Sequence, residues 1–131
     1  MHVLIVQSNE PLAHLWQSNL ERLGSEVVVA ASGDEAVELI ENSDFDVIVL
    51  DLVLSQGSAL TVADVAYFRQ PDANVVFVTD TTFFSDGSIF THSANARAFI
   101  QSTTPPQDLA EIVHHYGRPV SRADEAHQRL I

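Results

Sequence analysis

The chain has 131 residues, 46% of them hydrophobic, and a formal net charge of −12. This length and composition suit one domain with a single hydrophobic core. The negative charge disfavours nucleic acid and anionic membranes as partners, and the absence of cysteine excludes disulfides and thiolate zinc sites.

Lysine is absent from the whole chain, and its basic residues are Arg22, Arg69, Arg97, Arg118, Arg122 and Arg129. An excess of acidic residues is also typical of proteins from salt-loving hosts, so the charge alone assigns no function. The N-terminus lacks a basic start, and no stretch approaches the roughly 20 apolar residues of a membrane span. We therefore expect a cytoplasmic protein that does not bind membranes.

Five short apolar runs, rich in β-branched residues and bounded by polar or turn residues, predict buried parallel strands. They cover residues 3–6, 27–29, 47–50, 75–78 and 98–100. Segments with helical spacing lie between and after them. This alternation predicts an α/β fold, a flavodoxin-like doubly wound sheet of five parallel strands in the order 2-1-3-4-5.

The first two helices have the clearest sequence signals. The first has an apolar stripe that ends at Gly24, a residue suited to a helix C-cap. That stripe consists of Leu12, Leu15, Trp16, Leu20 and Leu23. The second begins with the capping-box pattern of residues 32–35 and ends at residues 42–44.

Three more helical segments are expected. Residues 60–68 predict a helix that ends before Pro71, and Pro105-Pro106 opens the last helix. Between them, residues 85–92 lack a clean apolar stripe and indicate a short or irregular helix.

The predicted domain covers residues 1–117. Pro119 ends the last helix, and residues 121–125 can cap a further short helix. The apolar stripe of that segment is thin. Residues 118–131 are therefore expected to form either a polar tail or a short helix.

Loops that follow parallel strands gather at one edge of the sheet, where ligands usually bind. Four loops should meet there. Their polar residues are Gln7, Ser8, Asn9 and Glu10, then Asp51, then Thr79 and Asp80, and finally Ser102 and Thr103.

Over residues 3–116 the sequence resembles the receiver domain of two-component response regulators. Residues 3–6, 45–52 and 75–79 carry the match. Residues 45–52 are the most specific, since that family places its phosphate-accepting aspartate at the end of such an apolar strand. The resemblance implies that Asp51 occupies the phosphoacceptor position.

The resemblance also assigns switch positions to Thr79, the hydroxyl residue that hydrogen-bonds the phosphoryl group, and Phe99, the aromatic residue whose rotamer reports activation. The family's acidic pair, which holds Mg²⁺, aligns with Gln7 and Ser8, and its lysine aligns with Ser102. Mg²⁺ prefers hard anionic oxygen ligands. We therefore expect no metal site and no cofactor, with Mg²⁺ bound weakly at most.

Substitutes for the missing groups are few. Asn9, Glu10 and Asp80 could rebuild a weak metal site, although Glu10 is expected inside the first helical turn. Arg97 lies five residues before Ser102, about 16 Å along an extended strand, so it cannot replace the lysine.

No other catalytic pattern is present. The histidines show no paired metal spacing, and the chain has neither a glycine-rich phosphate loop nor a nucleophile elbow. We expect that the chain is not an enzyme. The histidines are His2, His14, His92, His114, His115 and His127.

The leading hypothesis is a stand-alone atypical receiver, a pseudo-receiver, that acts by protein–protein contact with impaired or absent Mg²⁺-dependent phosphorylation. The partner would be a histidine kinase, a phosphotransfer protein, an output protein or a second copy. Its docking surface is predicted on the fourth helix, residues 98–100 and the last helix, near Phe83, Phe84 and Phe90. One alternative is an unconventional phosphoacceptor phosphorylated on Asp51. Another is a small-ligand-binding module that uses the emptied pocket.

Overall fold

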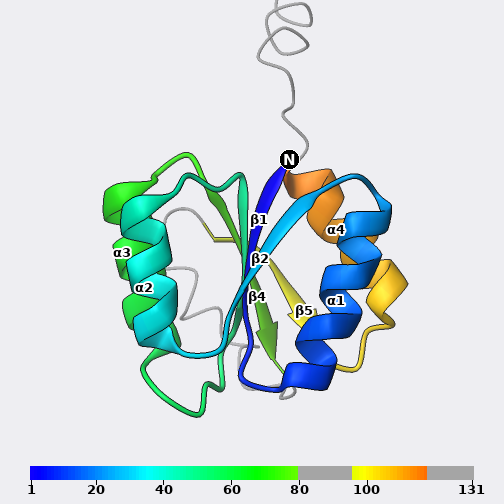
Figure 1. Ribbon diagram of the computed structural model, residues 1–131, viewed down its shortest axis with the longest axis horizontal. Coiled ribbons are helices and arrows are strands. Elements are labelled where there is room, and N and C mark those ends of the chain that lie inside the picture. The colour runs from blue at the N-terminus through cyan, green and yellow to red at the C-terminus, as the bar shows by residue number, and fades with distance from the viewer. Residues whose placement is uncertain (80–95, 118–131) are drawn as a thin grey trace, which may run out of the picture.

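The computed structural model describes residues 1–79 and 96–117, which form a parallel sheet with helices on both faces (Figure 1). The sheet has five strands in the order β2-β1-β3-β4-β5, which confirms the predicted fold class and strand order. The strands are β1 (His2–Val6), β2 (Glu26–Ala30), β3 (Val47–Asp51), β4 (Asn74–Thr79) and β5 (Ala96–Gln101).

The described helices agree with the predicted segments. They are α1 (Glu10–Arg22), α2 (Gly33–Asn42), α3 (Ala59–Arg69) and α4 (Pro106–Gly117). Here α4 is the helix that Pro105-Pro106 opens. The short helix expected at residues 85–92 and the segment 118–131 lie outside the described residues. None of the helices in the described ranges is both long and apolar enough to cross a bilayer.

The sheet separates two hydrophobic layers. Successive side chains of a strand point to opposite faces, so β1 sends Val3 and Ile5 to one layer and Leu4 and Val6 to the other. Helices α1 and α4 cover the first layer, and α2 and α3 cover the second (Figure 1). Because both faces are covered, the central strands are continuous apolar runs.

Three helices begin at a polar N-cap. These caps are Asn9, Ser32 and Ser58, and each side-chain oxygen accepts a hydrogen bond from the backbone N–H three residues later. At the start of α2, Glu35 also accepts a hydrogen bond from the Ala31 N–H at 3.2 Å. The polar residues that interrupt the apolar pattern thus satisfy backbone donors and fix where the helices start.

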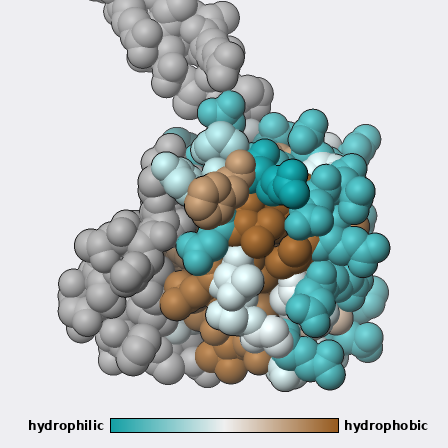
Figure 2. All heavy atoms as spheres, turned by 90° about the vertical axis from the view of Figure 1, so that its left-hand side faces the viewer, coloured by the Kyte–Doolittle hydropathy of each residue, from teal (hydrophilic) through white to brown (hydrophobic). Residues whose placement is uncertain are grey.

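Some apolar residues that helical spacing assigns to the core lie on the surface instead. In α1, Trp16 and Leu20 are buried, whereas Leu15 is 51% exposed. In α3, Phe68 is 81% exposed, and Figure 2 shows hydrophobic side chains gathered over the middle of the face formed by α2 and α3. Helix α3 is apolar around most of its circumference, so spacing alone does not select the side that faces the sheet.

A close contact between two glycines fixes the start of α2 against the loop that follows β3. Gly57 has a φ of +85°, and a Cβ added to it would lie 2.9 Å from the Cα of Gly33. The Gly33 N–H also donates to the carbonyl oxygen of Gln56 at 2.9 Å. This loop therefore cannot carry a side chain at position 57 without displacing α2.

Gly57→Ala is expected to destabilise the fold more than Gly24→Ala. Both glycines have positive φ, so each substitution costs about 1–2 kcal/mol for a left-handed residue. Only at Gly57 does the new methyl group meet backbone, because nothing lies within 4 Å of a Cβ at Gly24. The overlap should add about 1–3 kcal/mol. Urea unfolding followed by circular dichroism measures both losses, and equal losses would contradict this account.

Candidate functional site

The strand register places two polar side chains beside each other at the carboxyl edge of the sheet. Where β1 pairs with β3, Val6 lies opposite Leu50. The residues that come next along the chain are Gln7, which follows β1, and Asp51, which ends β3. The two positions that the sequence predicted for one site therefore meet at the centre of the sheet edge.

Gln7 is held at both ends of its side-chain amide. Its Nε2 donates to Asp51 Oδ2 at 2.5 Å, and its Oε1 accepts a hydrogen bond from the Asn9 backbone N–H at 3.0 Å. Because only the amide nitrogen can donate, one orientation satisfies both bonds. Gln7 is 3% exposed, so water scarcely competes for these partners.

Asp51 accepts a second hydrogen bond on its other oxygen. The Val53 N–H donates to Asp51 Oδ1 at 2.8 Å, which closes a turn at the start of the loop after β3. The residue is half-buried. Each carboxylate oxygen thus has a protein donor, while the residue stays partly accessible to solvent.

Ser8 joins two loops. Its Oγ donates to the Ala31 carbonyl oxygen at 2.9 Å and accepts from the Ser55 N–H at 3.0 Å. Asn9 is the N-cap of α1, and Glu10 is the exposed first residue of that helix, as the sequence predicted for Glu10. Two of these three side chains therefore satisfy backbone groups, and the third faces solvent.

Thr79 and Ser102 lie together at the ends of β4 and β5. The Ser102 N–H donates to the Thr79 carbonyl oxygen at 2.8 Å, and the Thr79 side chain is buried. Phe99 is half-buried and stacks on Phe77, with ring centroids 5.1 Å apart. The two residues expected to act as a switch thus lie on neighbouring strands, Thr79 buried at the end of β4 and Phe99 two residues before the end of β5.

One further candidate is not brought into the site. Arg97 is the second residue of β5 and so lies toward the opposite edge of the sheet from Ser102, as expected. Asp80 lies outside the described residues. Within residues 1–79 and 96–117, no group of three or more histidine, aspartate or glutamate side chains could hold a metal ion.

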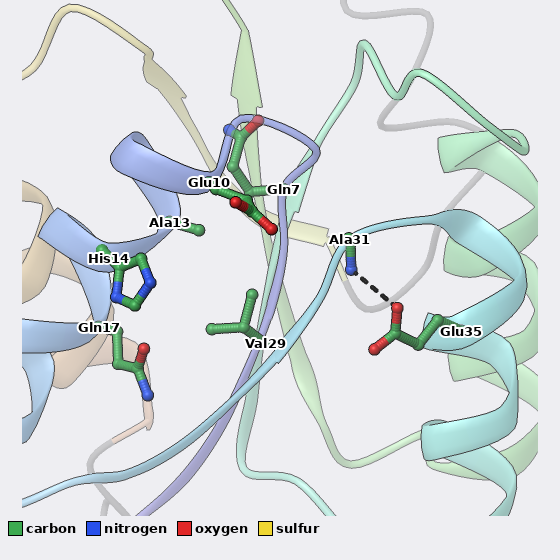
Figure 3. A pocket seen from close by; sticks show the side chains of 8 residues that line it. All are labelled: Gln7, Glu10, Ala13, His14, Gln17, Val29, Ala31 and Glu35. Carbon is green, nitrogen blue, oxygen red and sulfur yellow. Dashed lines mark hydrogen bonds between the residues drawn. The ribbon is translucent and has the colours of Figure 1, made fainter.

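A cleft of about 350 Å³ opens beside Gln7, between α1, β2 and the start of α2 (Figure 3). Glu10 lies on its α1 side and Glu35 on its α2 side, where the carboxylate is held by the Ala31 N–H. A cleft of this volume can accommodate a small polar molecule. Its lining residues are Gln7, Glu10, Ala13, His14, Gln17, Val29, Ala31 and Glu35.

Neither the bond between Gln7 and Asp51 nor the bridge made by Ser8 follows from residue types alone. One signal does point to the first contact, because Gln7 and Asp51 each end an apolar strand and those strands are adjacent in the predicted order. Ser8 carries no such signal. Its two partners lie in loops, whose paths the apolar pattern does not determine.

Residues 3–114 match the response regulator receiver domain family. The response regulator SaeR of Staphylococcus aureus is 25% identical over 108 residues, which are 82% of this chain and 46% of SaeR. The chain thus spans about half the length of the curated relatives it matches.

Solved structures of receiver domains are similar over most of the chain. A receiver domain protein (CheY-like) from Methanospirillum hungatei JF-1 has a TM-score of 0.79 at 26% identity, covering 89% of this chain and 93% of that one. The response regulator TrrA from Thermotoga maritima, solved in complex with Mg²⁺-BeF, has a TM-score of 0.76 at 21% identity, with coverages of 88% and 97%. At 21% identity, the similarity to TrrA shows a shared fold and nothing more.

Gln7→Met should destabilise the fold by about 1–3 kcal/mol, because it keeps the volume but leaves Asp51 Oδ2 and the Asn9 N–H without this partner. Urea unfolding of Gln7→Met, Asp51→Asn and the double variant gives the coupling energy, expected to exceed about 0.5 kcal/mol. Gln17→Met is the matched control, since its amide makes only a 3.5 Å surface bond to Glu21. Additive losses for Gln7 and Asp51 would contradict the inferred coupling.

Proposed function

Because the chain belongs to the response regulator receiver domain family, we propose that it is an atypical receiver that signals by protein–protein contact with impaired or absent Mg²⁺-dependent phosphorylation. Receiver domains of this family act in two-component signalling. The observation that carries the proposal is the hydrogen bond from Gln7 Nε2 to Asp51 Oδ2. It places a hydrogen-bond donor, and not a second carboxylate, beside the Asp51 carboxylate.

The residues around Asp51 do not fit a Mg²⁺ site. Mg²⁺ requires near-octahedral oxygen ligands and favours carboxylates, whereas the family's acidic pair is replaced by neutral Gln7 and Ser8. The Gln7 carbonyl oxygen is already bound to the Asn9 N–H, and Ser8 Oγ bridges two loops. The proposed mechanism therefore contains no metal-dependent step.

A phosphoryl group on Asp51 would also lack its usual cation from the protein. The chain contains no lysine, and the family's lysine position holds Ser102. Arg97 is near the start of β5, away from the strand end at which Ser102 lies. Neither a metal ion nor an ammonium group is thus available to balance the charge of a transferred phosphoryl group.

Contact with a protein is the output that remains. A hollow of about 760 Å³ runs along β5 and α4, with apolar walls that include Phe99, Ile112 and Tyr116. It coincides with the described part of the docking surface predicted from the sequence, whereas Phe83, Phe84 and Phe90 lie outside the described residues. The partner is a histidine kinase, a phosphotransfer protein, an output protein or a second copy.

Two observations support alternative functions. Asp51 is only half-buried, which suits an unconventional phosphoacceptor that takes a phosphoryl group without a strong metal site. The cleft beside Gln7 suits a module that binds a small polar ligand (Figure 3). Phosphotransfer from a kinase or acetyl phosphate, detected by intact mass, would favour the first, and thermal stabilisation by a metabolite would favour the second.

Millimolar Mg²⁺ and beryllofluoride should leave the melting temperature of the wild-type chain unchanged. A ligand stabilises a fold only if it binds the folded state appreciably, and Gln7 and Ser8 offer no charge to Mg²⁺. Gln7→Glu/Ser8→Asp is the positive control. Its crowded carboxylates should lower the melting temperature, and Mg²⁺ at about ten times its Kd should restore about 1.4 kcal/mol.

Asp51→Asn completes this comparison. It should keep the fold, because the remaining side-chain oxygen can still accept from the Val53 N–H. Calorimetry of wild type and Asp51→Asn, each with and without Mg²⁺ and beryllofluoride, measures the response. A Mg²⁺-dependent rise in the wild type that Asp51→Asn abolishes would overturn the proposal and favour the phosphoacceptor.

A further inference from the structure

Helix α3 presents large apolar side chains to solvent. Its contact with the sheet uses small and medium residues, and the buried ones are Ala59, Val62, Ala63 and Ala66. On the opposite side, Phe68 is 81% exposed, Tyr67 is 45% exposed and Leu60 is 44% exposed. A surface helix normally places polar residues there, whereas this helix also exposes three large apolar side chains.

The three exposed residues share one face of the helix. Leu60 precedes Tyr67 and Phe68 by seven and eight positions, which are two turns, and Asp64 lies one turn from each. The rings of Tyr67 and Phe68 meet edge to face, with centroids 5.9 Å apart. Single exposed apolar residues are common, but a group like this one is typical of a binding surface.

Helix α2, which packs beside α3 on the same face of the sheet, carries acidic side chains. Asp34, Glu38 and Glu41 are exposed and recur at intervals of four and three residues, so they form a stripe along the outside of α2. Figure 2 shows hydrophilic side chains beside the hydrophobic ones on this face. The contact of Gly33 with Gly57 holds the start of α2 against the loop that leads to α3.

The local charge is strongly negative. Arg69 is the one basic residue within α2 and α3, and it lies at the C-terminal end of α3. The hollow that it lines is also lined by Asp44, Asp46 and Asp72. Arg69 thus lies among other carboxylates, and acidic residues outnumber basic ones on these two helices.

We propose that this surface, formed by Leu60, Tyr67 and Phe68 with the carboxylates Asp34, Glu38 and Glu41, binds a basic amphipathic helix of a partner protein. Apolar residues of that helix pack on α3, and its lysine or arginine residues pair with the α2 carboxylates. Charge complementarity selects this occupant. A second copy would bring the same carboxylates together on a chain of net charge −12, and those like charges repel.

The proposal names the chemistry of a partner and rests on the proposed function only in assuming that the chain acts through protein contact. It does not involve phosphate on Asp51. The surface also differs from the hollow along β5 and α4, because α3 and α4 cover opposite faces of the sheet (Figure 1). The two surfaces could therefore be occupied independently.

A display library of helical peptides with randomised outward positions tests the proposal, selected on the full chain and counter-selected on Phe68→Ser. Enriched peptides should carry apolar residues on one side and lysine or arginine on the other. Their affinity, measured by fluorescence anisotropy, should fall at least about tenfold in Phe68→Ser. Glu38→Gln/Glu41→Gln should weaken binding and remove much of its salt dependence.

Matched variants test whether peptide binding depends on this surface and not on another part of the chain. Leu15→Ser removes an exposed apolar residue from α1, on the other face of the sheet, and should leave affinity unchanged. Asp51→Asn should also leave it unchanged, so a failure here is distinct from a failure of the proposed function. Melting curves check folding, and Leu60→Ser serves as a second variant if Phe68→Ser lowers stability.

Three outcomes would overturn the proposal. The first is that no peptide is enriched, or that the enriched peptides bind Phe68→Ser as tightly as the wild type. The second is that the enriched peptides lack basic residues. The third is self-association of the chain that sedimentation detects and Phe68→Ser abolishes, which would make a second copy the occupant.

Discussion

The hydrogen bond between Gln7 and Asp51 joins the ends of the two strands at the centre of the sheet. It exists because β1 and β3 are adjacent and their register brings these residues to the same level. The Gln7 amide is in turn oriented by the Asn9 N–H, and Asn9 caps α1. One buried side chain therefore connects the carboxylate, the first loop and the first helix, and the geometry of the site depends on it.

This arrangement changes the electrostatics of the sheet edge. Several carboxylates in one pocket repel each other and raise their affinity for protons or cations. The neutral Gln7 amide beside Asp51 adds no such repulsion and supplies a hydrogen bond. The chain as a whole is highly acidic, yet its carboxylates are spread over the surface, where water and salt screen them. Under the proposed function, the centre of the sheet edge needs no bound cation.

The sequence predicts the strands and helices because the spacing of apolar residues follows the backbone geometry of each element. Apolar runs such as residues 47–50 and N-caps such as Ser32 report local structure directly, and they determine the strand order once crossovers are right-handed. The hydrogen bond made by Gln7 was not predicted. A neutral residue at the expected position of the acidic pair indicates that a carboxylate is missing, but it does not indicate where the amide N–H of Gln7 points. The exposure of Phe68 was missed for another reason. Helix α3 is apolar nearly all round, so its spacing does not reveal which side is buried.

The contact between Gly33 and Gly57 has a consequence for local opening. The Gly33 amide is the first of its helix, and first-turn amides usually have no partner within the helix. Here that amide is bonded to Gln56, in the loop that follows Asp51. Its exchange with solvent deuterium requires the loop and the start of α2 to separate. The segment after Asp51 therefore does not open alone but shares a cooperative unit with α2.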